Sequence, residues 1–214
     1  DEAIYATRGK ILLDMGKNAE AVKDFDKALE IRPGTTEIHF LRAKARAGLG
    51  LYKEAVTDLD EVIRADPKNP LALADRATAY DALKSYEKSM KDFVEAIKAD
   101  PDAATPELYY GLARTSLMAG KLENAIENFT VVIQKEPNYG LAYANRGVAR
   151  KAIGQFVEAA ADFRKALTLL KEPNRITQVK RHLEETEGRI SAVKRTDAVQ
   201  LSLPDPDGTE AGWP

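Results

Sequence analysis

A period of about 34 residues constrains this chain more than any other feature of its sequence. Proline recurs at Pro33, Pro67, Pro101 and Pro137, with spacings of 34, 34 and 36 residues. Repeats of this length are typical of solenoids, in which each unit buries its apolar face only against its neighbours. The period therefore predicts a stacked array of similar units rather than one central core.

Several other columns of residues keep the same register. Each unit has a small residue in its first half, a second small residue in its second half, and a large apolar residue four positions later. Glycine ends the first half of four units, and Lys84 takes its place in the third. The columns are Gly9, Ala43, Ala77, Ala113 and Gly147; Ala21, Ala55, Ser89, Ala125 and Ala159; Phe25, Leu59, Phe93, Phe129 and Phe163; and Gly16, Gly50, Gly120 and Gly154. Small residues allow two helices to approach closely, glycine suits the left-handed cap after a helix, and proline ends the next helix.

These columns resemble those of the tetratricopeptide repeat over about residues 2 to 171. The resemblance implies an all-α, right-handed superhelical solenoid of five helix pairs, and the physical reading of the columns agrees with it. It divides residues 1–173 into repeats at about 2–35, 36–69, 70–105, 106–139 and 140–173, with an insertion at Ala103 and Ala104.

Residues 174–195 are predicted to form one further helix, which brings the expected total to eleven helices and no strands. Its apolar stripe is Ile176, Val179, Leu183, Ile190 and Val193, with Thr186 in the same row. The last repeat of a solenoid exposes an apolar side, so this helix is interpreted as a cap; the alternative is an amphipathic helix that binds a partner.

Residues 196–214 differ in composition from the rest of the chain. They contain four acidic residues, three prolines and no Lys or Arg, as expected for a tail or linker. A second hypothesis is that Leu201, Leu203 and Trp213 anchor this segment in a groove, of its own chain or of a neighbour, and so produce weak self-association.

Composition argues against several classes of function. Lys and Arg total 32 and Asp and Glu total 34, so no charge excess favours nucleic acid or an anionic membrane. No apolar run is long enough for membrane insertion, and there is no cysteine. The two histidines, His39 and His182, lack the convergent partners of a catalytic or metal site, so the prediction is a protein without enzymatic activity, cofactor or metal. The compartment is not fixed: a cytoplasmic protein is favoured over one exported after signal removal.

Arginine and aspartate form two further columns. Repeats one, two, three and five carry Arg8, Arg42, Arg76 and Arg146 in the first half, and Asp24, Asp58, Asp92 and Asp162 in the second. Repeat four lacks both and carries Leu112 and Asn128 instead. The joint loss predicts an ion pair inside each repeat; the alternative is a row of arginines presented to acidic ligands.

The resemblance also implies a concave groove lined by the first helix of each pair, and a function in binding a peptide or partner protein. The residues at the groove columns are Lys10, Phe40, Lys44, Asp75, Thr78, Asp81, Tyr110, Arg114, Met118, Asn145 and Lys151. Co-chaperones of the same family clamp the acidic ends of heat-shock chaperones, but Lys10, Leu41, Leu71 and Asp75 depart from the clamp pattern. Two alternatives remain: an assembly scaffold that acts through self-association or its convex face, and an accessory region of a larger enzyme.

Overall fold

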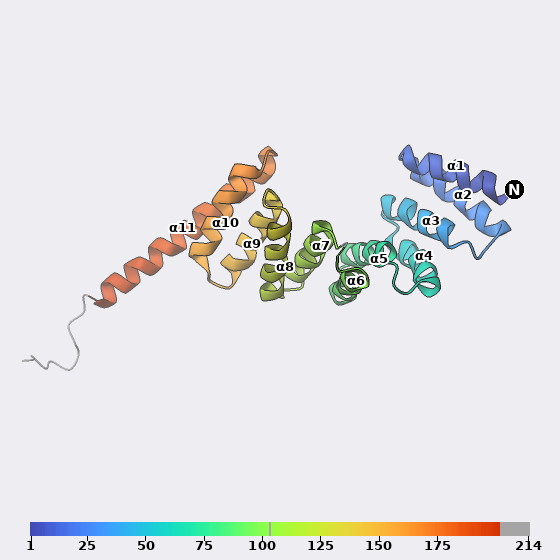
Figure 1. The fold of residues 1–214 in the computed structure, drawn as a ribbon. Coiled ribbons are helices and arrows are strands. Elements are labelled where there is room, and N and C mark those ends of the chain that lie inside the picture. The colour runs from blue at the N-terminus through green and yellow to red at the C-terminus, as the bar shows by residue number, and fades with distance from the viewer. Residues whose placement is uncertain (103, 202–214) are drawn as a thin grey trace, which may run out of the picture. The chain divides into compact units, whose positions relative to one another are not determined.

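The computed structural model describes residues 1–102 and 104–201, which form eleven α-helices and no strands (Figure 1). The first ten helices are α1 Glu2–Asp14, α2 Asn18–Ile31, α3 Thr36–Gly48, α4 Tyr52–Ala65, α5 Pro70–Ala82, α6 Tyr86–Ala99, α7 Pro106–Met118, α8 Leu122–Lys135, α9 Gly140–Ala152 and α10 Phe156–Leu169, and the last is α11 Pro173–Leu201. The predicted all-α solenoid of helix pairs is confirmed.

The chain divides into two compact units. Unit 1 is Asp1–Pro137 and holds α1 to α8; unit 2 is Asn138–Pro214 and holds α9 to α11. Helix α11 ends at Leu201, so it continues past the boundary that the sequence analysis placed at residue 195. The remainder of the predicted tail, including Leu203 and Trp213, lies outside the described residues, and the repeat boundaries stay predictions.

The glycine column occupies the left-handed backbone region, as its position after each first helix requires. Gly16, Gly50, Gly120 and Gly154 have φ values of 72°, 76°, 75° and 82°. Lys84 adopts the same conformation, with φ 56°, although its Cβ makes this region unfavourable. The turn geometry is therefore imposed by the stacking of the repeats even where the residue opposes it.

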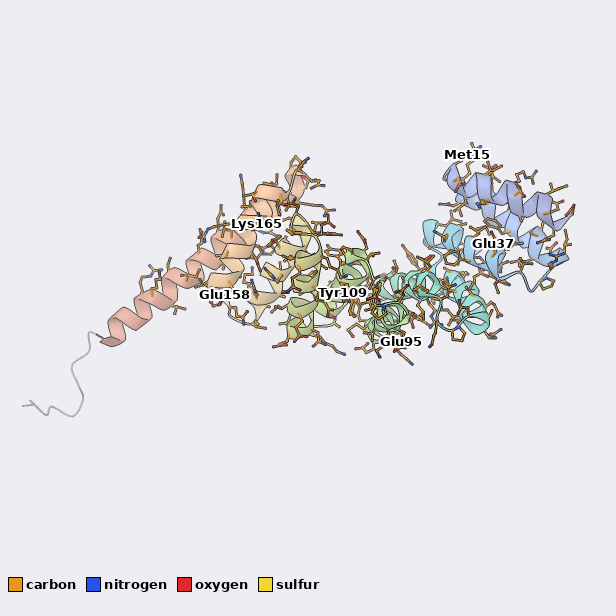
Figure 2. All side chains as sticks on the ribbon, in the orientation of Figure 1. Met15, Glu37, Glu95, Tyr109, Glu158 and Lys165 are labelled. Atoms are coloured by element: carbon orange, nitrogen blue, oxygen red, sulfur yellow. The ribbon has the colours of Figure 1, made fainter. Side chains whose placement is uncertain are left out.

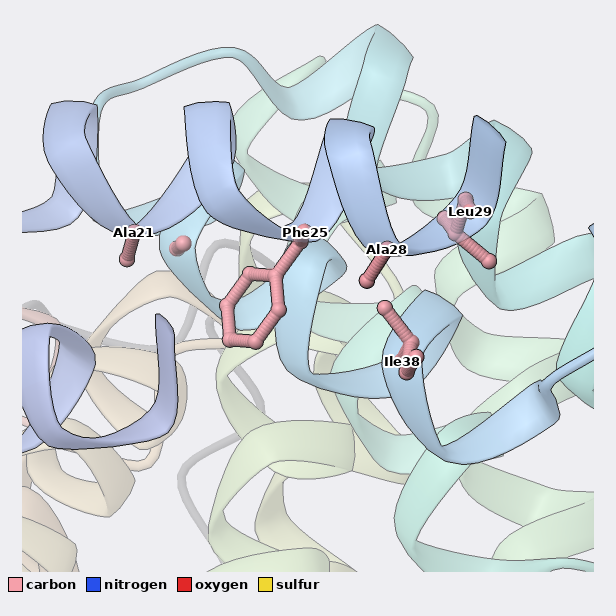
Figure 3. Packing of buried hydrophobic residues seen from close by; sticks show 6 residues of the cluster. Ala21, Phe25, Ala28, Leu29 and Ile38 are labelled. Carbon is pink, nitrogen blue, oxygen red and sulfur yellow. The ribbon is translucent and has the colours of Figure 1, made fainter. Parts of the chain in front are cut away.

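Each helix pair closes around the large residue of its second helix. Phe25 is fully buried, and a Cβ added to Gly9 would lie only 2.7 Å from its ring. Figure 3 shows Phe25 on the same face of α2 as Ala21 and Ala28, which are also fully buried. Burial of such a side chain contributes roughly 1.5–3 kcal/mol, so the aromatic column supplies much of the cohesion of the pairs.

In unit 1 the first helices form a continuous row. Helix α1 contacts α3, α3 contacts α5, and α5 contacts α7, whereas no two second helices of this unit contact each other. Helices α2, α4 and α6 instead contact the first helix of the next pair, α3, α5 and α7 respectively. The first helices therefore occupy the more closely packed, inner side of unit 1, where the sequence analysis placed the groove.

The predicted arginine–aspartate pairs are all present. Each joins the two helices of one repeat through charge-assisted hydrogen bonds. The shortest contacts are 2.6 Å for Arg8–Asp24, 2.5 Å for Arg42–Asp58, 2.7 Å for Arg76–Asp92 and 2.7 Å for Arg146–Asp162. The four carboxylates are at most 7% exposed, so each arginine binds a buried carboxylate of its own repeat; Arg42, Arg76 and Arg146 are themselves 11–18% exposed, whereas Arg8 is 61% exposed.

Two of the arginines also bind the preceding repeat, which sequence reasoning missed. Arg42 contacts Asp26 at 2.6 Å, and Arg76 contacts Asp60 at 2.7 Å. Asp26 and Asp60 each stand two residues after the aspartate of their own repeat, so a column that could have been read from the sequence marks this contact. The ion pairs thus link neighbouring repeats as well as the helices within one.

Repeat four replaces this charged layer with an apolar one. Leu112 is buried against Met90 and Phe93 of the preceding repeat, and Val94 stands where the other repeats have Asp26 and Asp60. Both members of the contact between repeats are therefore apolar here. Such a substitution is physically reasonable, because a buried ion pair and a well-packed apolar pair of similar volume have comparable stability.

Helix α11 packs on α10 within unit 2. Val179 is 5% exposed and Leu183 packs beside it against Phe163. Thr186, the polar member of the stripe, is fully buried, and its hydroxyl donates a hydrogen bond to the carbonyl of His182. Helix α11 thus covers the apolar side of the last pair, as predicted for a cap.

Candidate functional site

The predicted groove residues divide between the two units. Nine lie on the first helices of unit 1: Lys10 on α1; Phe40 and Lys44 on α3; Asp75, Thr78 and Asp81 on α5; and Tyr110, Arg114 and Met118 on α7. Asn145 and Lys151 lie on α9 of unit 2. The candidate site is therefore built from the row of first helices in unit 1.

Three of these residues line one cavity between α3 and α5. Lys44, Asp75 and Thr78 surround a space of about 160 Å³. Its floor is apolar and comes from helices of two repeats: Ala43, Ala47, Tyr52, Leu59 and Ala79. The cavity thus combines two opposite charges with an apolar base. Tyr52 was not predicted, because its contribution depends on how α4 packs beneath the groove.

Asp75 is the chemically unusual member of this cavity. No hydrogen bond or ion pair joins its carboxylate to another described residue, in contrast to the buried aspartates of the helix pairs. Burial raises the pKa of the Asp75 carboxyl, and the positive charge of Lys44 opposes this rise. A carboxylate held in a cavity without a partner is a typical feature of a binding site.

A second cavity adjoins the same stretch of α3. It has a volume of about 300 Å³ and lies where α3, α4 and the start of α5 meet. Phe40, Val62 and Leu71 give it an apolar lining, with Thr36, Glu37 and Asn69 at its edge. Phe40 also lies under the Lys44 ammonium, 5.4 Å from the ring centroid. Phe40 of the apolar cavity is therefore in contact with Lys44 of the charged cavity.

Two predicted groove residues further along contact each other. Arg114 of α7 donates to the carboxylate of Asp81 on α5 at 2.5 Å, and the Thr115 hydroxyl donates to the same carboxylate at 3.1 Å. The Asp81 side chain is 8% exposed, whereas Arg114 is 46% exposed. Asp81 therefore positions Arg114 across the joint between repeats three and four, and the guanidinium remains accessible.

The other groove residues of unit 1 are dispersed. Tyr110 packs edge-on against Phe129, with ring centroids 5.7 Å apart. Met118 is 59% exposed at the end of α7, and Lys10 is exposed on α1. Tyr110 thus contributes to packing as well as to the surface, while Met118 and Lys10 are accessible but belong to neither cavity.

In unit 2, Lys151 is held by the capping helix. Its ammonium contacts the Glu185 carboxylate at 2.8 Å and Nδ1 of His182 at 3.0 Å. Burial, together with the nearby Lys151 charge, lowers the pKa of the His182 imidazole, so the neutral ring accepts a hydrogen bond from Lys151. Phe163 stacks on the same ring. Sequence reasoning did not predict this contact, because it joins α9 and α11. Asn145 lies half-buried on the same helix α9.

His39 also has a structural environment. Its Nδ1 lies 2.9 Å from the Asp58 carboxylate and its Nε2 lies 3.0 Å from the carbonyl of Pro33. The ring thus links the start of α3 to the ion-pair layer of repeat two. In the part of the chain that the structure describes, no group of three or more His, Asp or Glu side chains is placed to hold a metal ion, and no helix has the length and apolar character to span a membrane.

Comparison with known proteins agrees with this architecture. The sequence model of a tetratricopeptide-repeat family matches residues 7–70 and 40–104. A mouse protein described as FK506-binding protein-like is 39% identical over 62 residues, which cover 29% of this chain and only 18% of that protein.

Two solved structures have the same fold. MamA from Desulfovibrio magneticus RS-1 superposes with a TM-score of 0.74 at 22% identity, covering 78% of this chain and 94% of that structure. YrrB, described as a TPR protein with an unusual peptide-binding site, has a TM-score of 0.73 at 19% identity and covers 85% and 92% of the two chains. The helix pairs, the repeat columns and these matches show that the chain has the tetratricopeptide-repeat fold, with the sequence match to the family over residues 7–104.

Proposed function

We propose that this chain is a non-catalytic interaction module that binds an extended segment of a partner protein along α3, α5 and α7 of unit 1. The observation that carries the proposal is the cavity in which Lys44, Asp75 and Thr78 meet. Three residues predicted from separate sequence columns line one space there, and one of them is a half-buried carboxylate without a partner.

The chemistry of the cavity suits a peptide amide. Asp75 offers a hydrogen-bond acceptor, and Lys44 offers a donor on the other side of the space. A carboxamide or a backbone peptide unit presents both complementary groups, N–H and C=O. The cavity is small, so it fits one such group rather than a folded surface. The neighbouring apolar cavity beside Phe40 would take an aliphatic side chain of the same segment.

Arg114 extends the surface toward α7. Because Asp81 fixes one side of its guanidinium, the remaining donors are positioned without further loss of side-chain freedom. They would meet a carboxylate or carbonyl of the bound segment beyond the Lys44–Asp75 cavity. The proposed ligand is therefore an extended peptide with an amide, an aliphatic side chain and an acceptor group in separate positions.

The test uses a displayed library of random peptides selected on the full chain. Affinities of the selected peptides are then measured by fluorescence anisotropy for wild type, Asp75→Leu and Lys44→Met. Loss of a buried hydrogen bond costs about 1–3 kcal/mol, so each variant should weaken binding by about tenfold or more. Glu123→Gln, an exposed change on α8, is the matched control and should bind normally.

Two further measurements make the outcome decisive. Circular dichroism should show equal helical content in all variants, since both substituted residues face a cavity rather than a packed core. If every selected peptide binds Asp75→Leu and Lys44→Met as tightly as wild type, the binding surface lies elsewhere and the proposal is wrong.

A further inference from the structure

A cavity of about 620 Å³ lies in unit 2, where α9, α11 and the start of α10 meet. Its lining consists of Lys151 of α9, Phe156 of α10, and Glu185 and Arg189 of α11. Two of these side chains are cationic and one is anionic, so the lining has a net positive charge. The volume is typical of a cavity that binds a small ligand. The cavity therefore has the size and the charge to bind an anion.

Arg189 is the cation of this cavity that has no partner among the described residues. No hydrogen bond or ion pair joins its guanidinium to another of them, and the residue is exposed. Arg189 follows Glu185 by four residues, so the two side chains lie on the same face of α11. Glu185, however, binds Lys151 at 2.8 Å. The donors of Arg189 are therefore available at the cavity, whereas the charge of Lys151 is neutralised.

Lys151 is held from two sides, by Glu185 and by His182. Nδ1 of His182 accepts a hydrogen bond from the Lys151 ammonium at 3.0 Å. Phe163 stacks on the imidazole with ring centroids 5.7 Å apart, which fixes the plane of the ring. Only a neutral imidazole has a nitrogen that can accept, so this contact lasts only while His182 is unprotonated. The protonation state of His182 therefore decides whether Lys151 keeps its second partner.

Glu185 is within reach of both Lys151 and His182. Its Oε2 lies 2.8 Å from Nζ of Lys151 and 3.8 Å from Nδ1 of His182. Protonation of His182 turns Nδ1 into a positively charged donor, which repels the ammonium 3.0 Å away and attracts the carboxylate. Glu185 and His182 stand three residues apart on α11, so they can pair without movement of the helix. Protonation therefore favours the transfer of Glu185 from Lys151 to His182.

The charges around His182 determine the pH range of this exchange. Lys151 faces the ring from α9, Arg181 and Glu185 act on it from α11, and α10 places the uncharged Phe163 against it. The exposed charged side chains of α10 include Glu158 and Lys165 (Figure 2). Burial, and then the charges of Lys151 and Arg181, lower the pKa of His182 below its ordinary value of 6.5, while Glu185 opposes them. The contribution of the neutral ring is therefore complete above pH 6.5 and is lost as pH falls through the lower pKa of the fold.

We propose that this cavity is a binding site for an oxyanion, such as a sulfate, phosphate or carboxylate group, and that protonation of His182 activates it. Glu185 then pairs with the imidazolium, and the Lys151 ammonium joins the Arg189 guanidinium in the cavity. Both groups form charge-assisted hydrogen bonds with oxyanions. While His182 is neutral, Arg189 is the single unpaired cation of the lining, and binding is weak. The inference is independent of the peptide site proposed for unit 1, because the two sites share no residue.

The first test measures sulfate binding to the full chain by NMR over a series of pH values. Sulfate stays fully ionised in the range where histidine titrates, so a change in its affinity comes from the protein. The affinity should rise by about tenfold as His182 is protonated, which is the factor that one charge-assisted hydrogen bond supplies. The midpoint of the rise should coincide with the titration of the His182 ring signals, and His39, the other histidine, is the internal reference.

Three variants assign the effect to the cavity. His182→Gln keeps a hydrogen-bond acceptor that does not titrate, so sulfate should bind weakly at every pH. Arg189→Ser removes the unpaired cation and should also bind weakly throughout. Arg175→Ser is the matched control, because Arg175 is an exposed arginine of the same helix outside the cavity, and it should behave as wild type does. Since both arginines are exposed, these two variants should keep the helical content of wild type, and they test the site even if His182→Gln weakens the packing of α11.

A second measurement follows Lys151 without any ligand. Mass spectrometry gives the ratio of acetylation at Lys151 to acetylation at Lys180, an exposed lysine of α11. The ratio cancels the general effect of pH on the reactivity of lysine. It should rise by about fivefold as His182 is protonated, which is the factor of one ordinary hydrogen bond.

An acetylated tetra-aspartate peptide, used in place of sulfate, identifies the source of the anion. Tighter binding of the peptide assigns the site to an acidic segment of a protein, and tighter binding of sulfate assigns it to a free anion; either result supports the site. The proposal is wrong if neither probe binds, if the pH dependence persists in His182→Gln, or if the acetylation ratio stays constant through the titration of His182.

Discussion

Two kinds of aspartate lie close together in unit 1, and their surroundings are opposite. Asp58, between α3 and α4, is 1% exposed and is surrounded by Arg42, Arg46 and His39, with contacts of 2.5, 2.7 and 2.9 Å. Asp75, at the cavity between α3 and α5, has only the distant charge of Lys44 to offset its burial.

The two environments have opposite effects on the stability of the fold. A buried carboxylate with several cationic partners holds helices together, because its charge is fully compensated. A carboxylate buried without a partner destabilises the fold. The aspartates of the ion-pair layer therefore contribute to folding, whereas the function proposed above assigns Asp75 to ligand binding.

The largest expected effect is the loss of the Asp58 carboxylate. Asp58→Ala leaves Arg42, Arg46 and His39 without their shared anion, and removing one partner of a buried ion pair costs about 3–5 kcal/mol. Urea unfolding should show a free energy of unfolding lower by about 3 kcal/mol or more. Asn128→Ala, at the same position of repeat four, should cost less than about 1 kcal/mol, because among the described residues the Asn128 side chain donates only to the Asn124 carbonyl. Equal losses of unfolding free energy in the two variants would contradict the stabilising role of the Asp58 ion pairs.

A double-mutant cycle tests whether the ion pair acts as a unit. Arg42→Leu/Asp58→Asn gives repeat two the residues that repeat four carries at these positions. The contact between Arg42 and Asp58 is lost in each single variant but can be lost only once in the double variant, which should therefore be more stable than the sum of the single losses predicts. The expected coupling is about 1–3 kcal/mol, measured by denaturant unfolding. Strict additivity would contradict the pairing.

Asp75→Asn should change the free energy of unfolding in the opposite direction from Asp58→Ala. The pKa of Asp75 is raised in the fold above its ordinary value of 3.8, so ionisation is less favourable in the folded state. The ionised Asp75 carboxylate therefore destabilises the fold. This destabilisation is absent below the pKa of Asp75 in the unfolded chain, grows as pH rises through its pKa in the fold, and is complete at pH 7. At pH 7 the variant should therefore be slightly more stable than wild type, by less than about 1 kcal/mol.

The control for Asp75 is Asp24→Asn. Arg8 lowers the pKa of Asp24 through a hydrogen bond, so this carboxylate stabilises the fold above pH 3.8, and that contribution is lost as pH falls through its folded pKa. Asp24→Asn should reduce stability at pH 7, and both differences from wild type should shrink in acid. A loss of stability on Asp75→Asn at pH 7 would show that Asp75 has a structural role.

The smallest expected effect is at Lys84, which ends the helix that carries Asp75. Lys84→Gly relieves a left-handed backbone at φ 56° and should raise the midpoint of thermal unfolding, by an amount equivalent to about 0.5 kcal/mol. This variant tests the stability of α5 independently of Asp75. Its gain in the free energy of unfolding should add to that of Asp75→Asn and should not vary with pH. A pH-dependent gain at Lys84 would mean that the Asp75 effect reflects α5 as a whole.

Much of the architecture could be predicted from the sequence because each repeat contacts only its neighbours. The period, the Gly9–Phe25 contact and the joint loss at Leu112 and Asn128 are local patterns that recur at fixed spacing. They predicted the helix pairs, the cap and all four ion pairs. The contacts of Asp26 and Asp60 with the next repeat were missed, although their spacing contains the signal.

Only the tertiary structure decided which predicted groove residues meet. The columns placed Lys44, Asp75 and Thr78 on inner helices, but the cavity they share depends on how α3 and α5 pack over Tyr52. The same packing paired Asp81 with Arg114 across a joint, and α11 engaged Lys151. Helix formation and pairing follow from periodic patterns along the chain. The exposure and ionisation of a side chain depend on neighbours tens of residues away, and the periodic patterns do not specify these neighbours.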